Sequence, residues 1–374
     1  YVRDGWNYND VAILYRTNAQ SRALEEKLMI HNIPYKIYGG QNFYQRKEIK
    51  DILAYLKTID NGLDGQAVKR IINVPKRGIG NTTIDRLQEY ADFNDITFWE
   101  ALVNAKDIDT IKNAALSKLE PFVDLIGRLR AKEEFMSLKE LAEAVIEDTG
   151  YIESLSQNET VEEVEARREN LDEFINKVVS YEEGCKEAGE EPTLSGLLEE
   201  VALIADIDNL DESEPHVMLM TLHSAKGLEF PIVYMTGMED GLFPSYMSIS
   251  TGDESDIEEE RRLCYVGITR AKETLIMSAA RMRTVRGETQ MNRTSRFVRE
   301  IPKELLAESA QMLKKNSEYS SITGKDHMEL PVRKRGQVAF NSYQREAISN
   351  TVFDKKTDSA PDYVVGDRVR HIKF

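Results

Sequence analysis

Two short segments of the chain carry residue types suited to phosphate and sugar chemistry. The first, Met-Thr-Leu-His-Ser-Ala-Lys-Gly-Leu-Glu-Phe at 220–230, follows an apolar run and predicts a loop at the carboxyl end of a strand, where ligands of open α/β sheets bind. Gly227 permits close backbone approach, and Glu229 offers a carboxylate to sugar hydroxyls. Thr221 and His223 are able to bond a phosphate or a sugar. The alternative for His223 is a satisfied, partly buried imidazole.

The second segment, Glu-Glu-Glu-Arg-Arg-Leu-Cys-Tyr-Val-Gly-Ile-Thr-Arg-Ala-Lys-Glu at 258–273, predicts a helix that ends just before Arg270. A guanidinium held at that helix end could reach a γ-phosphate. It would stabilise the charge of phosphoryl transfer, a role worth roughly 10³ to 10⁵ in rate where an arginine finger operates. Arg270 is therefore the candidate catalytic residue. The alternative is an ion pair that closes the helix.

A phosphate-cradling loop of the form Gly-x-x-x-x-Gly-Lys-Ser/Thr is absent from the sequence. The single Gly-Lys pair, at Gly324 and Lys325, is followed by Asp and lacks the upstream glycine. Tyr1 is not an initiator Met, and we expect a fragment of a longer protein. Whether the protein hydrolyses a nucleotide and whether this chain can do so alone are therefore separate questions.

Residues 73–80, Asn-Val-Pro-Lys-Arg-Gly-Ile-Gly, predict a hairpin between helices at 68–72 and 82–90, with Asn81 or Thr82 as the second helix's cap. The two glycines would expose backbone N–H groups at a helix N-terminus, which suits a DNA phosphate. The residues expected to contact DNA here are Lys76, Arg77, Gly78 and Gly80. The alternative is a plain turn between helices.

The net charge of −16 argues at first sight against nucleic-acid binding, because phosphate contacts need local Lys and Arg. The distribution of charge changes this interpretation. Residues 281–299 contain six arginines and one acidic residue, Glu288, while acidic residues crowd 159–214. A second basic cluster comprises Lys69, Arg70, Lys76 and Arg77. Local clusters set the field that a phosphate feels, although either cluster could be a solvated helix face.

The element pattern predicts an α/β fold. Expected strands lie at 11–15, 34–38, 217–222, 232–235 and 274–278, and a helical texture runs from about 43 to 210. We therefore expect a parallel-sheet domain interrupted by an inserted all-α domain. No run approaches the ~18 apolar residues of a membrane span. Cys185 and Cys264 lie far apart, which fits a reducing compartment and neither a disulfide framework nor a zinc site.

We expect five parts along the chain. The sheet domain comprises 1–40 and 215–302, and the helical insertion comprises 41–214. Residues 303–361 are polar and predict a flexible linker. Residues 362–374 alternate in polarity like the first strand of a small β-barrel that the sequence does not complete.

Five segments together resemble the UvrD/PcrA/Rep family of superfamily 1 DNA helicases, most closely its Gram-positive members. They are Tyr-Arg-Thr-Asn-Ala-Gln-Ser-Arg at 15–22, Gly-Gly-Gln-Asn-Phe-Tyr-Gln-Arg-Lys-Glu-Ile-Lys-Asp at 39–51, Gly-Leu-Phe-Pro at 241–244, and the segments 220–230 and 258–273. The resemblance covers 1–302 with five segments in the family's order. The tail from 362 resembles the start of that family's Tudor-like domain.

The resemblance implies a fold and a set of contacts. The split sheet would be the RecA-like domain 2A, and the helical insertion would be domain 2B. Arg270 would contact the ATP γ-phosphate, and Glu229, with Gly227 beside it, would lie at the ribose. Contacts to single-stranded DNA are implied for Arg16, Asn18, Thr221 and His223, and contacts to duplex DNA for the 2B hairpin. One departure is Ser245, where relatives can carry a DNA-contacting His.

We therefore predict the C-terminal part of an ATP-dependent 3′-to-5′ DNA helicase of repair and replication, cytoplasmic and nucleoid-associated. ATP and Mg²⁺ would be bound mainly by the N-terminal RecA-like domain of the same protein, and this chain would hold no metal. Expected partners are single-stranded DNA, single-strand/duplex junctions and that N-terminal domain, with RNA polymerase and repair proteins bound through the tail. The alternative is a non-catalytic DNA-binding or protein-docking module.

Overall fold

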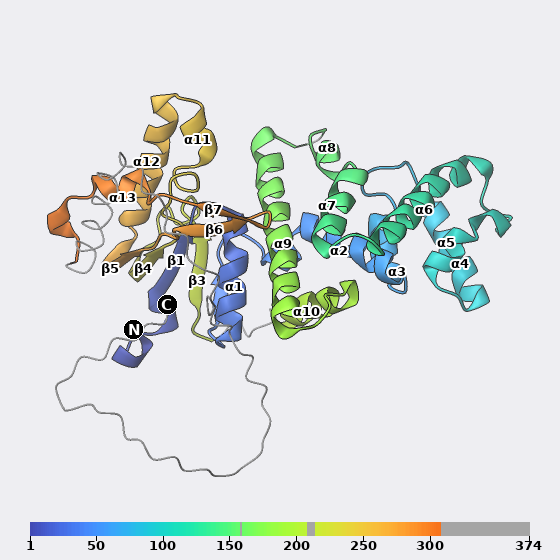
Figure 1. Cartoon of the computed structure of the whole chain (residues 1–374), viewed down its shortest axis with the longest axis horizontal. Helices are drawn as coiled ribbons and strands as arrows, with labels where there is room; N and C mark the ends of the chain where they lie inside the picture. The colour runs from blue at the N-terminus through green and yellow to red at the C-terminus, as the bar shows by residue number, and fades with distance from the viewer. Residues whose placement is uncertain (158, 208–213, 308–374) are drawn as a thin grey trace, which may run out of the picture. The chain divides into compact units, whose positions relative to one another are not determined.

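The computed structural model describes residues 1–157, 159–207 and 214–307, and all of them fall in one compact unit (Figure 1). Only residues 303–307 of the expected linker are among them, and they include a short 3₁₀ helix, Lys303–Leu305. The rest of the linker and the expected barrel strand at 362–374 lie outside the described residues.

A parallel sheet of five strands forms the frame of the α/β part, in the order β2-β3-β1-β4-β5. The strands are β1 (Val11–Tyr15), β2 (Tyr35–Ile37), β3 (Val217–Thr221), β4 (Phe230–Met235) and β5 (Ala271–Met277). β1 is central, with Tyr15 opposite Thr221 of β3 and Leu14 opposite Met235 of β4. The predicted α/β fold with a parallel sheet is confirmed.

Both faces of the sheet are covered, which explains the nearly continuous apolar sequence of β1, β3 and β4. On one face, side chains of α1 (Ser21–Ile30) pack against Tyr15 and Leu219. On the other face, Cys264 of α12 (Glu254–Ile268) and Phe297 of α13 (Arg296–Glu300) pack against Leu14 and its neighbours. Burial raises the pKa of the Cys264 thiol to about 12, in keeping with a packing role.

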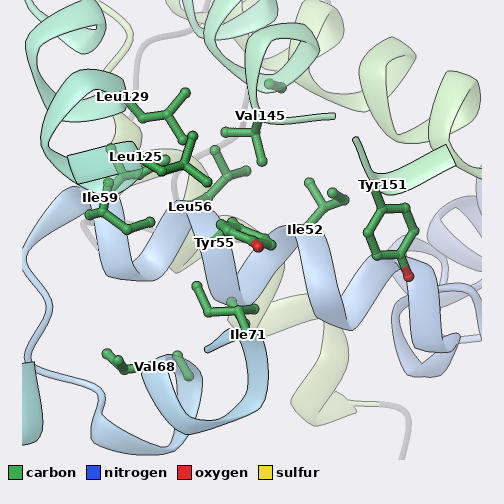
Figure 2. Close-up of a cluster of buried hydrophobic side chains, with 14 of the residues drawn as sticks. Ile52, Tyr55, Leu56, Ile59, Val68, Ile71, Leu125, Leu129, Val145 and Tyr151 are labelled. Carbon is green, nitrogen blue, oxygen red and sulfur yellow. The ribbon is translucent and has the colours of Figure 1, made fainter. Parts of the chain in front are cut away.

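Between β2 and β3 the structure describes helices and no strand. They are α2 (Lys47–Asp60), α3 (Gly65–Ile71), α4 (Asn81–Asn94), α5 (Phe98–Val103), α6 (Asn113–Glu133), α7 (Leu138–Asp148), α8 (Tyr151–Leu155), α9 (Val161–Ala188) and α10 (Leu194–Ile207). These helices share one hydrophobic core around α2, in which Ile52, Tyr55, Leu56 and Ile59 are almost fully buried (Figure 2). The domain boundaries drawn from the sequence stay predictions.

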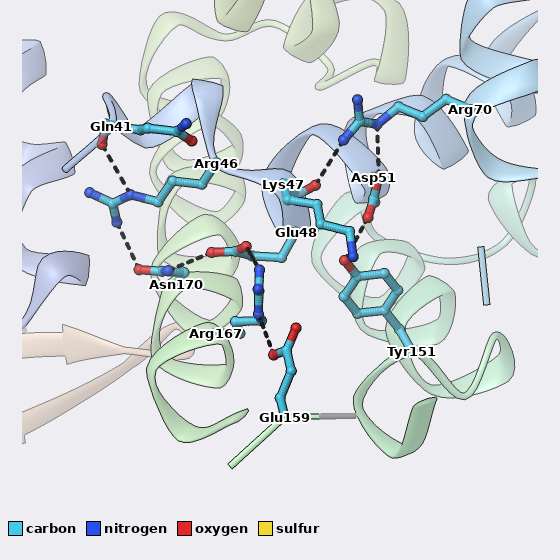
Figure 3. Close-up of polar contacts among 10 residues, drawn as sticks. All are labelled: Gln41, Arg46, Lys47, Glu48, Asp51, Arg70, Tyr151, Glu159, Arg167 and Asn170. Atoms are coloured by element: carbon cyan, nitrogen blue, oxygen red, sulfur yellow. Dashed lines mark hydrogen bonds and ion pairs between the residues drawn. The ribbon is translucent and has the colours of Figure 1, made fainter. Parts of the chain in front are cut away.

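Buried polar contacts fix the start of α2 against α9 (Figure 3). Arg46 donates to Asn170 Oδ1 at 2.7 Å, and Glu48 accepts from Asn170 at 2.6 Å and from Arg167 at 2.7 Å. Arg46 and Glu48 are 7 % and 3 % exposed, so their charges need these partners. Charged residues in segment 39–51 therefore hold the helical region in place.

Several elements were not expected from the sequence. β6 (Met282–Val285) and β7 (Glu288–Met291) form an antiparallel hairpin, and α11 (Tyr246–Ser250) precedes α12. The hairpin turns through Arg286 and Gly287, whose φ angles are 51° and 77°, a conformation that favours glycine at the second position. Ser245 caps α11 by accepting the N–H of Ser248.

Candidate nucleotide and nucleic-acid interfaces

The connection 222–229 runs from the carboxyl ends of the parallel strands (the carboxyl edge of the sheet) to their amino ends (the amino edge). Thr221 ends β3 beside Tyr15, whereas Phe230 begins β4 beside Ala271, the first residue of β5. Because all strands are parallel, the first pair marks the carboxyl edge of the sheet and the second pair marks the amino edge. The expectation that the whole loop lies at the carboxyl ends is therefore right only for its first residues, Thr221 and His223. Glu229 lies at the opposite edge.

At the carboxyl edge, Arg16 is engaged by a carboxylate that the sequence did not single out. Its Nη2 lies 2.7 Å from Glu260 Oε1, and its Nε lies 3.1 Å from both carboxylate oxygens. Glu260 lies in the acidic run of α12 and is 5 % exposed. Burial and the nearby charge of Arg16 lower the pKa of His223. The neutral imidazole is thus favoured beside a paired guanidinium.

Asn18 and Thr221 complete the predicted single-strand contacts at this edge. Asn18 lines a cavity of about 370 Å³ together with Gly40, Arg46 and Lys47. The Thr221 hydroxyl lies 3.0 Å from the Ser224 hydroxyl and accepts the Ser224 N–H at 3.2 Å. Thr221 therefore shapes the turn that carries His223.

At the amino edge, Arg270 is held by neutral oxygens. It donates to Val266 O and Leu228 O at 2.9 Å each, and to Thr269 Oγ1 at 3.0 Å. No carboxylate within the described ranges lies within 4.0 Å of it. The ion pair considered as an alternative is not formed, although the bond to Val266 does cap α12. Arg270 is thus oriented without being neutralised, which leaves its charge for an anion.

Packing at the end of α12 fixes this arrangement. A Cβ on Gly267 would lie 2.5 Å from Leu222 Cδ2, so any other residue there would force buried side chains beneath the helix to shift. Gly227, with φ of 90°, takes a conformation that favours glycine and leads to the exposed Glu229. Glu229 follows Leu228, which accepts from Arg270. An exposed carboxylate and an un-neutralised guanidinium suit the sugar and the phosphates of a nucleotide.

The hairpin at 73–80 is built around Asn73. Its Oδ1 accepts the N–H of Arg77 at 2.8 Å and the N–H of Ile79 at 3.3 Å. Those two amides are therefore engaged inside the hairpin, and the N–H groups of the two glycines beside Ile79, which we expect to face a DNA phosphate, are not among them. Gly78, with φ of 73°, lies between them, and Gly78 and Gly80 are exposed.

The Arg77 side chain turns into the helical core. Its guanidinium donates to Ile71 O at 2.9 Å and to Tyr55 Oη at 2.6 Å, and it lies 4.9 Å above the Phe122 ring. The expectation that Arg77 offers its charge to DNA is thus not supported by its contacts. Lys76 is exposed. The helix cap also differs, because α4 begins at Asn81 with Gly80 as its cap.

Three carboxylates pair with four of the six arginines of the basic segment 281–299. The ion pairs are Arg283–Glu239 at 2.9 Å, Arg286–Asp172 at 2.7 Å, Arg296–Asp240 at 3.3 Å and Arg299–Asp240 at 3.1 Å. Arg70 of the second cluster pairs with Asp51 at 2.7 Å, and Lys69 lies over the Phe98 ring. Neither cluster is the continuous positive surface that the sequence suggested.

The described residues contain neither a membrane-spanning helix nor a cluster of metal-binding side chains. No helix there is long and apolar enough to cross a membrane. No group of three or more His, Cys, Asp or Glu side chains there could hold a metal ion.

Known proteins are similar to this chain over nearly its whole length. The model of the UvrD-like helicase C-terminal domain matches residues 2–282. The ATP-dependent DNA helicase PcrA of Staphylococcus epidermidis is 42 % identical over 372 residues, which are 99 % of this chain and 48 % of that protein. PcrA of Staphylococcus aureus strain Mu50 is 43 % identical over 371 residues, again 99 % of this chain and 48 % of that protein. The chain spans about half the length of these relatives. It belongs to the UvrD-like helicase family, whose C-terminal domain it contains.

Proposed function

We propose that the chain is the C-terminal part of an ATP-dependent 3′-to-5′ DNA helicase, acting in the cytoplasm on nucleoid DNA during repair and replication. One observation carries this proposal: the connection 222–229 joins His223 at the carboxyl edge of the sheet to Glu229 at the amino edge. A single segment that joins a DNA-binding edge of the sheet to a nucleotide-binding edge is what a motor needs to couple DNA binding to ATP hydrolysis.

On the nucleotide side, ATP and Mg²⁺ would be bound mainly by the N-terminal RecA-like domain of the same protein. Bound there, they would supply the phosphoryl group and the cation that neutralises it. Arg270 would stabilise charge on the γ-phosphate, and its bonds to Val266 O and Leu228 O would keep the guanidinium oriented. Glu229, with Gly227 allowing close approach, would accept hydrogen bonds from the ribose.

At the carboxyl edge of the sheet, single-stranded DNA would contact Arg16, Asn18, Thr221 and His223. The lowered pKa of His223 supports contact with a base rather than with a phosphate, since a neutral imidazole carries no charge to attract an anion. Arg16 would have to exchange Glu260 for a phosphate to make a direct contact.

The helical region would hold the duplex at a single-strand/duplex junction. Lys76, Gly78 and Gly80 are exposed on the 73–80 hairpin, and Asn73 and Arg77 fix its shape from within. RNA polymerase and repair proteins remain proposed partners, bound through residues outside the described ranges.

A second candidate function is a DNA-binding or protein-docking module without catalysis. The hairpin favours it, because its supports come from the helical core alone and none comes from the sheet. Duplex binding by the 374-residue chain in the absence of nucleotide would agree with both candidates, so the decisive measurement is hydrolysis.

The test uses a full-length protein that contains this chain. Arg270→Ala should reduce DNA-stimulated ATP hydrolysis by roughly 10³-fold or more, while single-strand binding stays near that of the parent. Arg262→Ala is the matched control, since Arg262 is exposed near the middle of α12 and pairs with Glu259 three residues earlier. Near-normal hydrolysis in Arg270→Ala would show that Arg270 only caps α12, and the helicase assignment of this site would fail.

A further inference from the structure

A lysine from a distant helix lies against the 73–80 hairpin. Lys118 of α6 donates from Nζ to Gly78 O at 2.8 Å, across 40 residues of sequence. Its aliphatic stem runs along the same glycine, because a Cβ built on Gly78 would lie 3.3 Å from Nζ, 3.7 Å from Cε and 3.9 Å from Cδ. Lys118 is nevertheless exposed. It therefore joins the exposed surface of the hairpin.

The position of Lys118 is fixed by the helix that carries it. Phe122 follows one turn later on the same face of α6, is fully buried, and lies under the Arg77 guanidinium. Leu119 is 1 % exposed and anchors the same turn. Because α6 supports the hairpin from below through Phe122, the place of Lys118 beside Gly78 follows from packing as well as from its own hydrogen bond.

The charge of Lys118 is not neutralised nearby. An ammonium has three donors, and Gly78 O takes one of them. In the described part of the chain, no carboxylate lies within 4.0 Å of Lys118 or of Lys76. Lys106 differs, since it pairs with Glu120 of α6 at 3.3 Å. Lys76 on the hairpin and Lys118 of α6 beside it thus have no carboxylate partner among the described residues.

We propose that Lys118 is a further phosphate-contacting residue of the hairpin, and that with Lys76 it binds the backbone of duplex DNA. The proposal rests on the proposed function of the hairpin. Lysine acts on phosphate as a point charge and reads no base, which fits a motor that moves along any sequence. The bond to Gly78 O gives Lys118 a positioning role too, because it limits the conformations of the glycine.

Four variants separate charge from positioning. Lys118→Gln removes the charge but keeps a donor for Gly78 O, whereas Lys118→Arg keeps the charge. Arg128→Gln is the matched control, because Arg128 is exposed further along α6 and loses the same charge away from the hairpin. Lys76→Gln tests the hairpin itself. Thermal melting of each variant checks that the fold is unchanged.

The measurement is binding of the 374-residue chain to a fluorescent 20-base-pair duplex of mixed sequence, at a series of salt concentrations. Lys118→Gln should weaken binding about 5- to 10-fold at 0.1 M salt and reduce the log–log salt slope by about 0.9. Lys118→Arg should restore both quantities, and Arg128→Gln should leave both unchanged.

The opposing outcomes are distinct. If Lys76→Gln weakens binding and Lys118→Gln does not, the inference about Lys118 fails while the hairpin's function stands. If neither variant weakens binding, the proposed duplex contact of the hairpin fails as well. Weaker binding with an unchanged salt slope, or without rescue by Lys118→Arg, would assign Lys118 a purely structural role and overturn the proposal.

Discussion

The two basic regions of this chain look alike in sequence and differ in structure. In residues 281–299, four arginines pair with Glu239, Asp172 and Asp240. Lys76 on the 73–80 hairpin and Lys118 of α6 beside it are exposed, and no carboxylate of the described residues lies within 4.0 Å of either. The segment with more cations thus has the more compensated charge. A count of basic residues therefore says little about phosphate binding until the carboxylates that fold onto them are known.

The two kinds of cation also do different work. Arg283 neutralises Glu239, which is 0 % exposed and also accepts from Asn292 and from the N–H of Ala280. This network ties the β6–β7 hairpin to the end of β4. Lys76 and Lys118 neutralise no buried carboxylate, so substituting them should change DNA binding more than the stability of the fold.

The largest expected effect is on stability, from Arg283→Met. It would leave the buried Glu239 without its guanidinium, at a cost of roughly 3 kcal/mol in the free energy of unfolding. Arg281→Met is the control, because Arg281 is exposed two residues away. Urea unfolding of both variants measures the difference. Equal stability of the two would contradict the assignment of Arg283 as a structural cation.

The same pair predicts a pH dependence. Burial alone would raise the pKa of Glu239, but the hydrogen bonds from Arg283 and from the Ala280 N–H outweigh it and lower the pKa overall. A lowered folded-state pKa stabilises the protein above the unfolded-state pKa of the carboxyl, and this stability is lost as pH falls through the folded-state value. The gap between parent and Arg283→Met should therefore narrow in acid. A constant gap from neutral pH downward would count against the pairing.

The next effect is on binding, from reversing charge in the two regions. Lys76→Glu with Lys118→Glu should weaken duplex binding by more than about tenfold, through two lost phosphate contacts and added repulsion. Arg296→Gln with Arg299→Gln should change it by less than about twofold, since both arginines pair with Asp240. Titration of the same duplex compares them. A larger loss of duplex affinity from the arginine variants than from the lysine variants would contradict the difference drawn between the two basic regions.

A smaller effect should come from the support of the hairpin. Asn73→Ala removes the acceptor of two backbone N–H groups, at a cost of about 1 kcal/mol, and should weaken duplex binding a few-fold by loosening the loop. Asn73→Asp keeps an acceptor at this position and is the matched variant. Hydrogen exchange at the amides of Arg77 and Ile79 should accelerate only in Asn73→Ala. Unchanged exchange would show that other contacts fix the loop.

Much of the fold could be predicted, because short apolar runs such as Val11–Tyr15 and Val217–Thr221 carry their own signal. The β6–β7 hairpin could not, since its strands are short, polar and exposed. At the amino edge, the sequence pointed to Arg270 but not to its partner Leu228 O, because a backbone acceptor 42 residues away leaves no trace in residue types.

Other contacts of the candidate site were also hidden from the sequence. Glu260 lies in an acidic run typical of a solvated helix start, yet it is buried against Arg16. Lys118 is one lysine among the polar residues of α6, and only the packing of Phe122 beneath the hairpin brings it to Gly78. Long-range pairing decides which charges are compensated, and it is set by tertiary structure.

The smallest expected effect tests whether a paired arginine still acts on its surroundings. Arg16 is bound by Glu260, yet its charge helps burial to lower the pKa of His223. Arg16→Gln removes that charge and leaves Glu260 and Glu259, whose negative charges act in the opposite direction, so the pKa of His223 should rise. NMR titration of the His223 ring measures the shift, with Arg299→Gln as a control at a distant ion pair. An unchanged pKa would mean that Glu260 screens the charge of Arg16 fully. Cations paired with a carboxylate would then have no electrostatic effect on their neighbours, and the difference between paired and unpaired cations would be larger than proposed.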